Sequence, residues 1–364
     1  MKHNPDIGLG DVLTSAAGAL GAPNFIDSIG ISDSSVVVVC LVDGLGAVAI
    51  EEHEQLFPTL MKARGGSIEA AFPTTTSTGL VSLGTGLNPG MHGVVGASFW
   101  LPETGEVLAP LRWGSTPSPF AVQPEPTVFE RIQDVGVTCF SVGPKSYIHS
   151  GLTRAAFRGS EYLSAESVDD RSSLVADIAD RSSGKGPSLI YVYWPALDRT
   201  GHEFGVDSRC WREAAADVDA LIAKLHRALP PGGRLVVTAD HGMIDTKSRV
   251  WIEDDHRLSI DVRAIAGEPR MRHLYTDVPE DVAQRWSSVL GDTAQILTRE
   301  SAIRVGLFGE VDDVVAERIG DVVALPDDGI LLASHTYDEL VSSLPGQHGG
   351  RTEAERRIPA LILD

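Results

Sequence analysis

The sequence predicts an α/β fold, with a doubly wound and mostly parallel sheet flanked by helices, for three reasons. Short runs of apolar and often β-branched residues are typical of strands buried on both faces. Stretches with helical spacing separate these runs, as expected for crossover helices. Several runs end in a carboxylate or an imidazole, and open α/β folds place their active sites at the carboxyl ends of the strands. The predicted strands are Val36–Val42, Thr138–Val142, Leu189–Tyr193, Leu235–Thr238 and Ile358–Leu363.

One crossover helix is well marked by its pattern. Between residues 208 and 229, apolar residues recur at near-helical spacing, and the run stops at Pro230-Pro231-Gly232-Gly233. We therefore expect a helix from Ser208 to Leu229.

The length predicts one large domain with an insertion. A chain of 364 residues exceeds the size at which a single hydrophobic core usually stops growing. Residues 249–340 have strand and helix patterns of their own, so we take them as a smaller α+β cap inserted into a core made of residues 1–248 and 341–364. The cap elements that we expect are strands at Ile260–Ile265 and Met271–Tyr275 and helices at Asp281–Leu290 and Arg299–Gly306.

Charge and hydropathy exclude several classes of partner. The formal net charge is −20, which disfavours binding to a nucleic acid duplex or to an anionic membrane surface. No apolar run approaches the roughly 18 residues that a membrane span needs, and the first residues lack the apolar segment of a signal peptide. Cys40, Cys139 and Cys210 show no regular spacing, which favours reduced thiols. We therefore expect a cytoplasmic protein.

Four segments that are far apart in the chain carry residues that bind divalent cations. Three of them come shortly after predicted strands, which brings their side chains to the carboxyl edge of the sheet. Three aspartates and three histidines are enough ligands for two divalent metal ions. Oxygen and nitrogen ligands accept Zn, Mn or Fe, and of these we expect Zn or Mn. The six candidate ligands are Asp43, Asp198, His202, Asp240, His241 and His348.

A fifth segment, residues 72–93, can supply a nucleophile. It is rich in threonine, serine and glycine, and it leads from Phe72-Pro73 into a stretch that can open a helix. The backbone dipole partly activates a hydroxyl at a helix start, and a bound cation lowers the pKa of that hydroxyl much further. Such a turn taken alone is more often a helix cap. Next to the metal-type segments, we interpret it as the position of a nucleophilic threonine.

Six short motifs follow one another along the chain. They are Asp43-Gly44, Pro-Thr-x-Thr from Pro73, T-G-L-x-P-x-x-H-G at residues 85–93, D-x-x-x-H at 198–202, D-H-G at 240–242 and G-x-H-G at 346–349. In this order they resemble the nucleotide pyrophosphatase/phosphodiesterase branch of the alkaline phosphatase superfamily. The resemblance covers roughly residues 36–364 and implies an alkaline-phosphatase-like fold.

The resemblance also implies a role for each motif. Two metal ions would hold the entering and leaving oxygens of an in-line displacement at phosphorus. The family's nucleophile is the second threonine of Pro-Thr-x-Thr, which is Thr76 here, with Thr75 as the next choice, and its attack would leave a phospho-threonine. The implied ligand sets are Asp43, Thr76, Asp240 and His241 for one ion and Asp198, His202 and His348 for the other.

One position departs from the family pattern. Many members carry an asparagine a few residues after the H-G dipeptide, where it donates to a phosphoryl oxygen, and this chain has Ala97 there. Such a donor can contribute roughly 3 kcal/mol. We expect Lys145 to replace it, with Ser98 as a second candidate. The ordinary alternative for Lys145 is a solvated loop lysine.

An aromatic surface for a nucleobase is a further implication of the resemblance. Tyr193, five residues before Asp198, matches a stacking tyrosine of some relatives, and Phe99 follows the glycine-rich turn near the threonines. Stacking on such a ring contributes about 1–3 kcal/mol. Each of these rings can instead belong to the ordinary core.

Together these features predict a two-metal phosphodiesterase or nucleotide pyrophosphatase that acts on a small nucleotide-type substrate, with a cyclic dinucleotide as one candidate. Two alternatives stay open. The same scaffold supports a phosphonoacetate hydrolase-like activity, which Lys145 would suit. The chain can also be a catalytically inactive metal-binding nucleotide sensor, an alternative that only the missing asparagine favours. The oligomeric state does not follow from the sequence.

Overall fold

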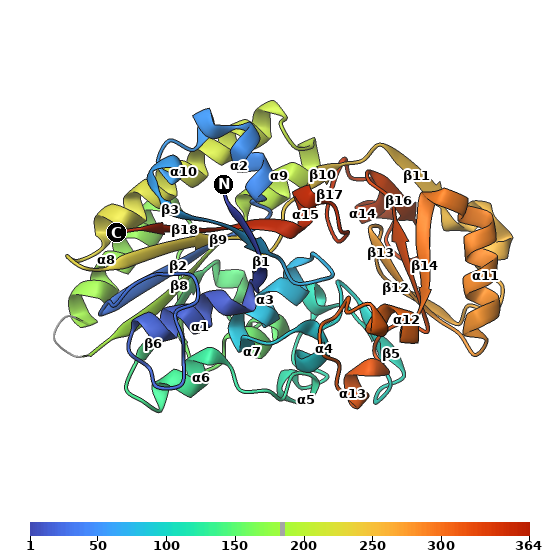
Figure 1. The fold of residues 1–364 in the computed structure, drawn as a ribbon, viewed down its shortest axis with the longest axis horizontal. Coiled ribbons are helices and arrows are strands. Elements are labelled where there is room, and N and C mark those ends of the chain that lie inside the picture. Colours follow the sequence, from blue (N-terminus) through green and yellow to red (C-terminus); the bar gives the residue numbers. More distant parts are fainter. Residues whose placement is uncertain (183–185) are drawn as a thin grey trace.

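A central sheet of eight strands organises the larger part of the molecule in the computed structural model, which describes residues 1–182 and 186–364 (Figure 1). All pairings from β9 across to β7 are parallel, as is the pairing of β1 with β3. The predicted fold class, a mostly parallel α/β sheet flanked by helices, is confirmed. In spatial order the strands are β1 (His3–Gly8), β3 (Arg64–Glu69), β18 (Arg357–Leu363), β9 (Arg234–Thr238), β2 (Val36–Val42), β8 (Ser188–Trp194), β6 (Thr138–Gly143) and β7 (Glu161–Ser164).

The direction of β18 differs from the prediction. It was expected to be parallel, but it runs antiparallel to both neighbours, β3 and β9. An apolar run predicts burial on both faces and carries no information on direction. Only residues 349–356 separate His348 from β18, so the chain enters the sheet at the edge where His348 lies and runs back across it.

Helices cover both faces of this sheet (Figure 1). Helix α10 occupies nearly the range predicted from the periodicity, and its N-cap Ser208 accepts a hydrogen bond from the backbone N–H of Trp211. The helices on one side are α2 (Ala47–Glu52), α8 (Val168–Ser182), α9 (Ala196–Phe204) and α10 (Arg209–Ala228). Those on the other side are α1 (Gly10–Ala19), α3 (Thr76–Thr85), α6 (Val128–Gln133) and α7 (Gly151–Phe157).

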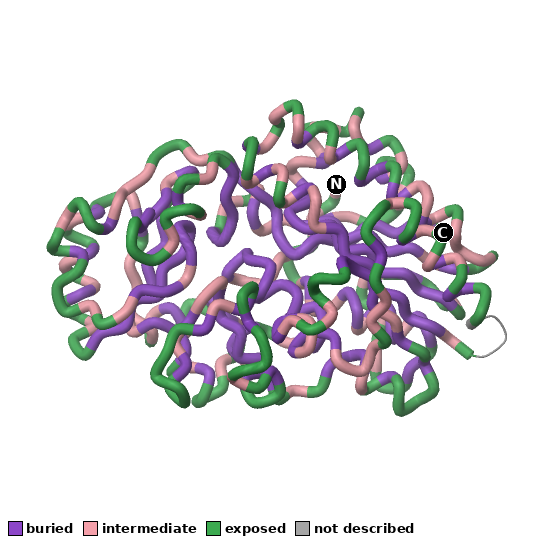
Figure 2. Tube along the Cα trace, turned by 180° about the vertical axis from the view of Figure 1, so that it is seen from behind, coloured by how far each residue is buried: buried purple, intermediate pink, exposed green. Residues whose placement is uncertain are grey.

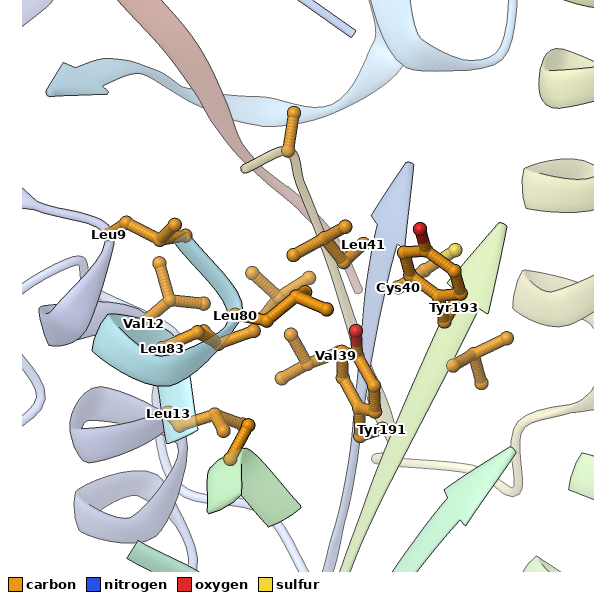
Figure 3. Packing of buried hydrophobic residues seen from close by; sticks show 14 of the residues in the cluster. Leu9, Val12, Leu13, Val39, Cys40, Leu41, Leu80, Leu83, Tyr191 and Tyr193 are labelled. Carbon is orange, nitrogen blue, oxygen red and sulfur yellow. The ribbon is translucent and has the colours of Figure 1, made fainter. Parts of the chain in front are cut away.

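The main core lies between the sheet and these helices. Strand β2 reads VVVVCLV and all seven of its residues are buried, and each fully buried side chain of this size contributes about 1.5–3 kcal/mol. Figure 3 shows Leu80 and Leu83 of α3 packed between Leu13 of α1 and Val39 of β2. This packing fixes α3, which carries the threonine segment, against the central strands.

Shorter elements complete the core. They are η1 (Glu54–Leu56), η2 (Leu60–Lys62), α4 (Pro89–His92), β4 (Phe99–Leu101), β5 (Glu106–Leu108), η3 (Pro110–Arg112), α5 (Pro119–Val122), η4 (Lys145–Tyr147) and α15 (Glu353–Arg356). Among the described residues, no helix is both long enough and apolar enough to cross a membrane.

A second sheet forms most of the cap (Figure 1). It is antiparallel, and α11 packs on it around the buried ring of Trp286. Figure 2 shows buried residues gathered along the large sheet and again in the cap. The sheet strands, in spatial order, are β12 (Ala264–Glu268), β13 (Met271–Tyr275), β15 (Val322–Pro326) and β14 (Ala294–Thr298). The other cap and junction elements are β10 (Ile244–Asp245), β11 (Ser248–Trp251), η5 (Ile252–Asp254), η6 (His256–Leu258), α11 (Pro279–Leu290), η7 (Gly291–Thr293), α12 (Arg299–Arg304), α13 (Asp313–Ala316), β16 (Ile330–Ala333), α14 (Glu339–Ser343) and β17 (Gly346–Gln347).

The cap elements differ from the prediction at one strand. The strand expected at residues 260–265 begins only at Ala264, because Asp261 has a left-handed backbone with φ of 58° and Ile260 lies in the turn after η6. The domain boundaries stay a prediction. The side chains of residues 249–340 pack into two different hydrophobic cores. Phe308 and Ile319 belong to the main hydrophobic core and not to the core around Trp286.

Candidate active site

The candidate metal ligands meet at the carboxyl edge of the central sheet. Strand β2 lies between β8 and β9, so the residues that follow these three parallel strands emerge side by side. Asp43 follows β2, Asp240 follows β9, and Asp198 stands in the first turn of α9 after β8. The strand pairing therefore assembles three carboxylates that are far apart in sequence.

Gly44 permits this close assembly. Its φ is +76°, and a Cβ atom at this position would lie 3.0 Å from both Cα and Cβ of Asp198. Only glycine combines this backbone conformation with so close an approach. The Asp43-Gly44 dipeptide therefore places two candidate ligands next to each other.

One group of ligands consists of Asp43, Asp240 and His241. Their potential ligand atoms lie within 4.8 Å of one another, and all three residues are buried. Nε2 of His241 is 3.5 Å from Oδ1 of Asp43 and 3.6 Å from Oδ2 of Asp240. This arrangement matches three of the ligands expected for the first ion.

A second group consists of Asp198, His241 and His348, again with ligand atoms within 4.8 Å of one another. Nε2 of His202 lies 3.5 Å and Nε2 of His348 lies 3.8 Å from Oδ1 of Asp198. His241 was expected only in the first group. Its ring stacks on His348 with the centroids 3.8 Å apart, which places it between the two groups.

The three histidines present the same nitrogen to the carboxylates. In each, Nδ1 faces a backbone carbonyl oxygen, at 2.8 Å for His202, 3.1 Å for His241 and 3.0 Å for His348. A carbonyl oxygen only accepts, so Nδ1 carries the proton and the Nε2 lone pair is left for a ligand.

The electrostatics of the cluster fit divalent cations. Burial, followed by the charges of Asp240 and Asp198, holds the pKa of Asp43 well above its usual range, and burial also raises the pKa of Asp240. Among the described residues, Oδ2 of Asp240 and Oδ1 of Asp198 have no hydrogen-bond partner. Buried carboxylates without partners are costly unless a cation compensates them, so this donor set is suited to metal ions.

The hydroxyls of the three consecutive threonines, residues 74–76, make different contacts. Oγ1 of Thr76 lies 3.3 Å from Nε2 of His241 and 3.5 Å from both carboxylate oxygens of Asp43. Thr75 donates to Glu268 at 3.4 Å, and Thr74 donates to the carbonyl of Gly350 at 2.8 Å. Of the three hydroxyls, the one at the start of α3 is the one that faces the ligand cluster.

Comparison with known protein families agrees with this geometry. The family model described as type I phosphodiesterase / nucleotide pyrophosphatase matches residues 37–351. The chain belongs to this family. The motifs that suggested the resemblance, from Asp43 to His348, all lie within the matched range, and members of the family are metal-dependent.

Individual relatives are distant from this family member. An uncharacterised pyrophosphatase/phosphodiesterase of Schizosaccharomyces pombe is 23% identical over 256 residues, which cover 65% of this chain and 50% of that protein. The chain spans half or less of the length of the first curated relatives that it matches.

Solved structures of two other proteins share the fold. Murine ectonucleotide pyrophosphatase/phosphodiesterase 5 superimposes with a TM-score of 0.69 at 19% identity, covering 90% of this chain and 87% of that chain. The same mouse protein is also known as an inactive threonine-to-alanine variant in complex with AMP. Phosphonoacetate hydrolase of Sinorhizobium meliloti, in complex with phosphonoformate, gives a TM-score of 0.68 at 19% identity and covers 90% of each chain.

A pocket of about 200 Å³ opens beside Thr76 in this family member. Its walls are mostly aromatic and aliphatic, and Tyr193 is part of them, as expected for an aromatic surface. The other rings of the pocket were not predicted from the sequence. Tyr147 follows β6 at the same edge of the sheet as the ligands, which is a signal that could have identified it. The other lining rings are Phe157, Tyr162 and Tyr191.

Tyr193 also touches a candidate ligand. Its hydroxyl donates a hydrogen bond to Oδ2 of Asp43. The rings of Tyr193 and Tyr147 meet edge to face with centroids 6.0 Å apart. Tyr193 therefore joins the pocket wall to the ligand cluster.

Three expected substrate-binding residues lie elsewhere. Phe99 is completely buried in the main core, so its ring cannot stack on a substrate in this structure. The Ser98 hydroxyl is used by the cap, since it donates to the carbonyl of Gly267 at 3.0 Å and accepts from the N–H of Gly267 at 2.9 Å. Lys145 is exposed and does not line the pocket, and its backbone N–H donates to Glu166 at 2.8 Å.

Proposed function

We propose that this chain hydrolyses small nucleotide-type phosphodiesters or pyrophosphates with Thr76 as its nucleophile. The observation that carries this proposal is the position of the Thr76 hydroxyl, which lies between the buried ligand cluster on one side and the aromatic pocket on the other. A phosphoryl group that binds at Thr76 can place an attached aromatic group in the pocket. The family match and the AMP complex of the mouse protein support this substrate class.

The six aspartates and histidines would hold two divalent cations, Zn or Mn. Asp43, Asp240 and His241 would hold one ion, and Asp198 and His348 the other. His202, whose Nε2 lies 3.5 Å from Oδ1 of Asp198, would complete the second set, and the His241 ring lies between the two sets. When bound, such ions supply the positive charge that stabilises the entering and leaving oxygens at phosphorus.

The reaction that this site supports proceeds in two displacements. In the first, Oγ1 of Thr76 forms a bond to phosphorus while the bond to the leaving oxygen breaks; the hydroxyl proton is lost and the leaving group takes up a proton. In the second, water attacks the phospho-threonine, which restores the threonine hydroxyl and releases a phosphate monoester. The sum is a diester and a water molecule converted to a monoester and an alcohol.

The start of α3 can replace the asparagine that position 97 lacks. The N-cap Thr75 makes no side-chain hydrogen bond to the first turn of this helix, and the first N–H groups of a helix have no partner inside it. The loop at Gly96 lies beside this turn, because Ser77 donates to the Gly96 carbonyl at 2.9 Å. We propose that backbone N–H groups at Thr76 and Ser77 donate to a phosphoryl oxygen.

The pocket favours a nucleotide over a small phosphonate. A doubly anionic substrate such as phosphonoacetate needs a positive side chain for its carboxylate, and the residues that line the pocket in the described part of the chain include no lysine or arginine. Lys145, which would have suited that activity, is exposed. A volume of about 200 Å³ has room for one base-sized ring system, so the second base of a cyclic dinucleotide would lie outside.

A substrate panel tests the proposal. The protein is reconstituted with Zn²⁺ or Mn²⁺ and assayed with bis(p-nitrophenyl) phosphate, dinucleoside polyphosphates, cyclic dinucleotides and phosphonoacetate. We expect turnover of diesters and pyrophosphates that carry a nucleoside. Turnover of phosphonoacetate alone would support the phosphonate alternative, and metal binding without any turnover would support the inactive sensor.

A further inference from the structure

The cap contributes a carboxylate to the edge of the candidate ligand cluster. Glu268 is the last residue of β12, and its side chain is 9% exposed. It packs flat on the backbone of Gly349, where a Cβ atom would lie 2.6 Å from Cδ of Glu268. Glu268 thus reaches out of the cap sheet onto the loop that carries His348.

The turn that carries Glu268 is firmly attached to the core. Arg270, two residues further on, makes a two-pronged ion pair with Glu355 of α15, at 3.0 and 2.9 Å. Oε1 of Glu355 also accepts from the N–H of Gly350 at 2.8 Å. These buried contacts fix the position of the β12–β13 turn relative to the Gly349-Gly350 backbone.

Glu268 faces two segments of the candidate site. Its Oε2 atom lies 3.5 Å from Nδ1 of His348 and accepts a hydrogen bond from Thr75 at 3.4 Å. Nδ1 of His348 therefore has two oxygen neighbours, the Thr74 carbonyl at 3.0 Å and the Glu268 carboxylate. Both oxygens favour the tautomer with the proton on Nδ1. This leaves the lone pair on Nε2, the nitrogen that faces Asp198.

We propose that Glu268 is a positioning residue for His348, so that the cap completes one of the two cation sites of the core. The inference rests on the proposed metal-dependent function. A carboxylate behind a ligating histidine fixes the orientation of the ring and makes its other nitrogen a better donor, and loss of such a partner typically lowers metal affinity about 10–100-fold. The hydrogen bond from Thr75 ties the same carboxylate to the residue directly before Thr76.

Metal titration tests this role without reference to turnover. Metal-free protein is titrated with Zn²⁺, and separately with Mn²⁺, against a chelating indicator, to obtain the number of ions and the Kd of each. For the wild type we expect two ions. In Glu268→Gln, which keeps the shape of the side chain, we expect one ion to bind about 10–100-fold more weakly and the other to be unchanged. Glu268→Asp keeps the charge on a shorter side chain. Its affinity for this ion should lie between those of the wild type and Glu268→Gln.

Asp338→Asn is the matched control. Asp338 pairs with Arg272 inside the cap, at 2.6 and 2.9 Å, and touches none of the candidate ligands. The Asp338→Asn substitution should lower the thermal stability of the protein and leave both ion affinities unchanged. Equal affinities in the wild type, Glu268→Gln and Glu268→Asp would overturn the role of Glu268, as would a loss of the same size in Asp338→Asn. A wild type that binds no ion would instead overturn the proposed function on which the inference rests.

Discussion

Tyr193 donates a hydrogen bond from its hydroxyl to Oδ2 of Asp43, so one ring of the aromatic pocket also restrains a candidate metal ligand. The sequence predicted a stacking role for this tyrosine. The structure adds a polar contact at the far end of the ring, and these two roles can be separated by substitution.

Tyr193→Phe keeps the ring and removes the hydroxyl. We expect kcat or metal affinity to fall about tenfold, because Asp43 loses a partner that orients it, while KM for nucleotide substrates changes little. Steady-state kinetics at saturating metal and a Zn²⁺ titration measure the two effects. Tyr147→Leu is the counterpart. It removes a pocket ring and leaves the hydrogen bond from Tyr193 to Asp43 in place. It should raise KM about tenfold with little effect on metal affinity. Reversed effects in the two variants would contradict this division of roles.

Thr76→Ala should remove nearly all turnover and leave the fold intact, because it deletes one hydroxyl and little core volume. We expect kcat to fall at least about 10³-fold, with an unchanged circular dichroism spectrum. Thr75→Ala should retain most activity, since its hydroxyl faces Glu268 and not the ligand cluster. Mass spectrometry of acid-quenched wild type should show a phosphate on the peptide that contains Thr76. Full activity of Thr76→Ala beside an inactive Thr75→Ala would show that the register is wrong.

Lys145→Ala should change kcat and KM for phosphodiesters by less than about threefold, because exposed side chains away from the site contribute little. The lysine is exposed, and the contact that anchors its segment is made by its backbone N–H. A loss of about 100-fold in kcat, the size expected for an oxyanion donor, would instead restore Lys145 as the replacement for the missing asparagine.

Metal binding should stabilise the protein more at higher pH. The pKa of Asp43 is raised by burial and by its acidic neighbours, so protons compete with the metal for this carboxylate in mildly acidic solution. The pKa of His348 is lowered well below its usual range, mainly by burial and then by His241 and His202, so protons compete less for this imidazole. The rise in Tm on adding Zn²⁺ should therefore be larger at about pH 8 than at about pH 5.

The same carboxylate should destabilise the metal-free protein as the pH rises. A group with a raised pKa binds more protons in the folded than in the unfolded state above its ordinary pKa, so its contribution to stability is lost with increasing pH. Asp43→Asn removes this charge. Without metal, the variant should melt at a higher temperature than the wild type at about pH 8, yet it should gain little on adding Zn²⁺. A lower Tm of the metal-free variant would contradict this account of the cluster.

Local sequence patterns predicted most of the fold and most of the residues in the ligand cluster. Runs such as VVVVCLV mark strands buried on both faces. Asp43 directly follows such a strand and Asp240 comes two residues after another, so the parallel topology brings them together. The direction of β18 was not predictable from its composition, because burial does not depend on direction.

Contacts between the cap and the core were harder to predict from the sequence. Glu268 comes from a strand far from the other site residues and has no motif around it, and its role depends on how the β12–β13 turn packs on Gly349. Phe99 was misjudged for the opposite reason: it lies near the threonines in sequence, but its ring turns into the main core.

We propose that Thr76 attacks a phosphodiester with the help of metal ions held by the six aspartates and histidines. The most direct test is the rate of bis(p-nitrophenyl) phosphate hydrolysis by one preparation of wild-type protein, measured metal-free and after reconstitution with Zn²⁺ or Mn²⁺. We expect negligible turnover without metal, recovery at about two ions per chain, and no recovery in Thr76→Ala. Equal turnover in the metal-free and reconstituted protein would contradict it.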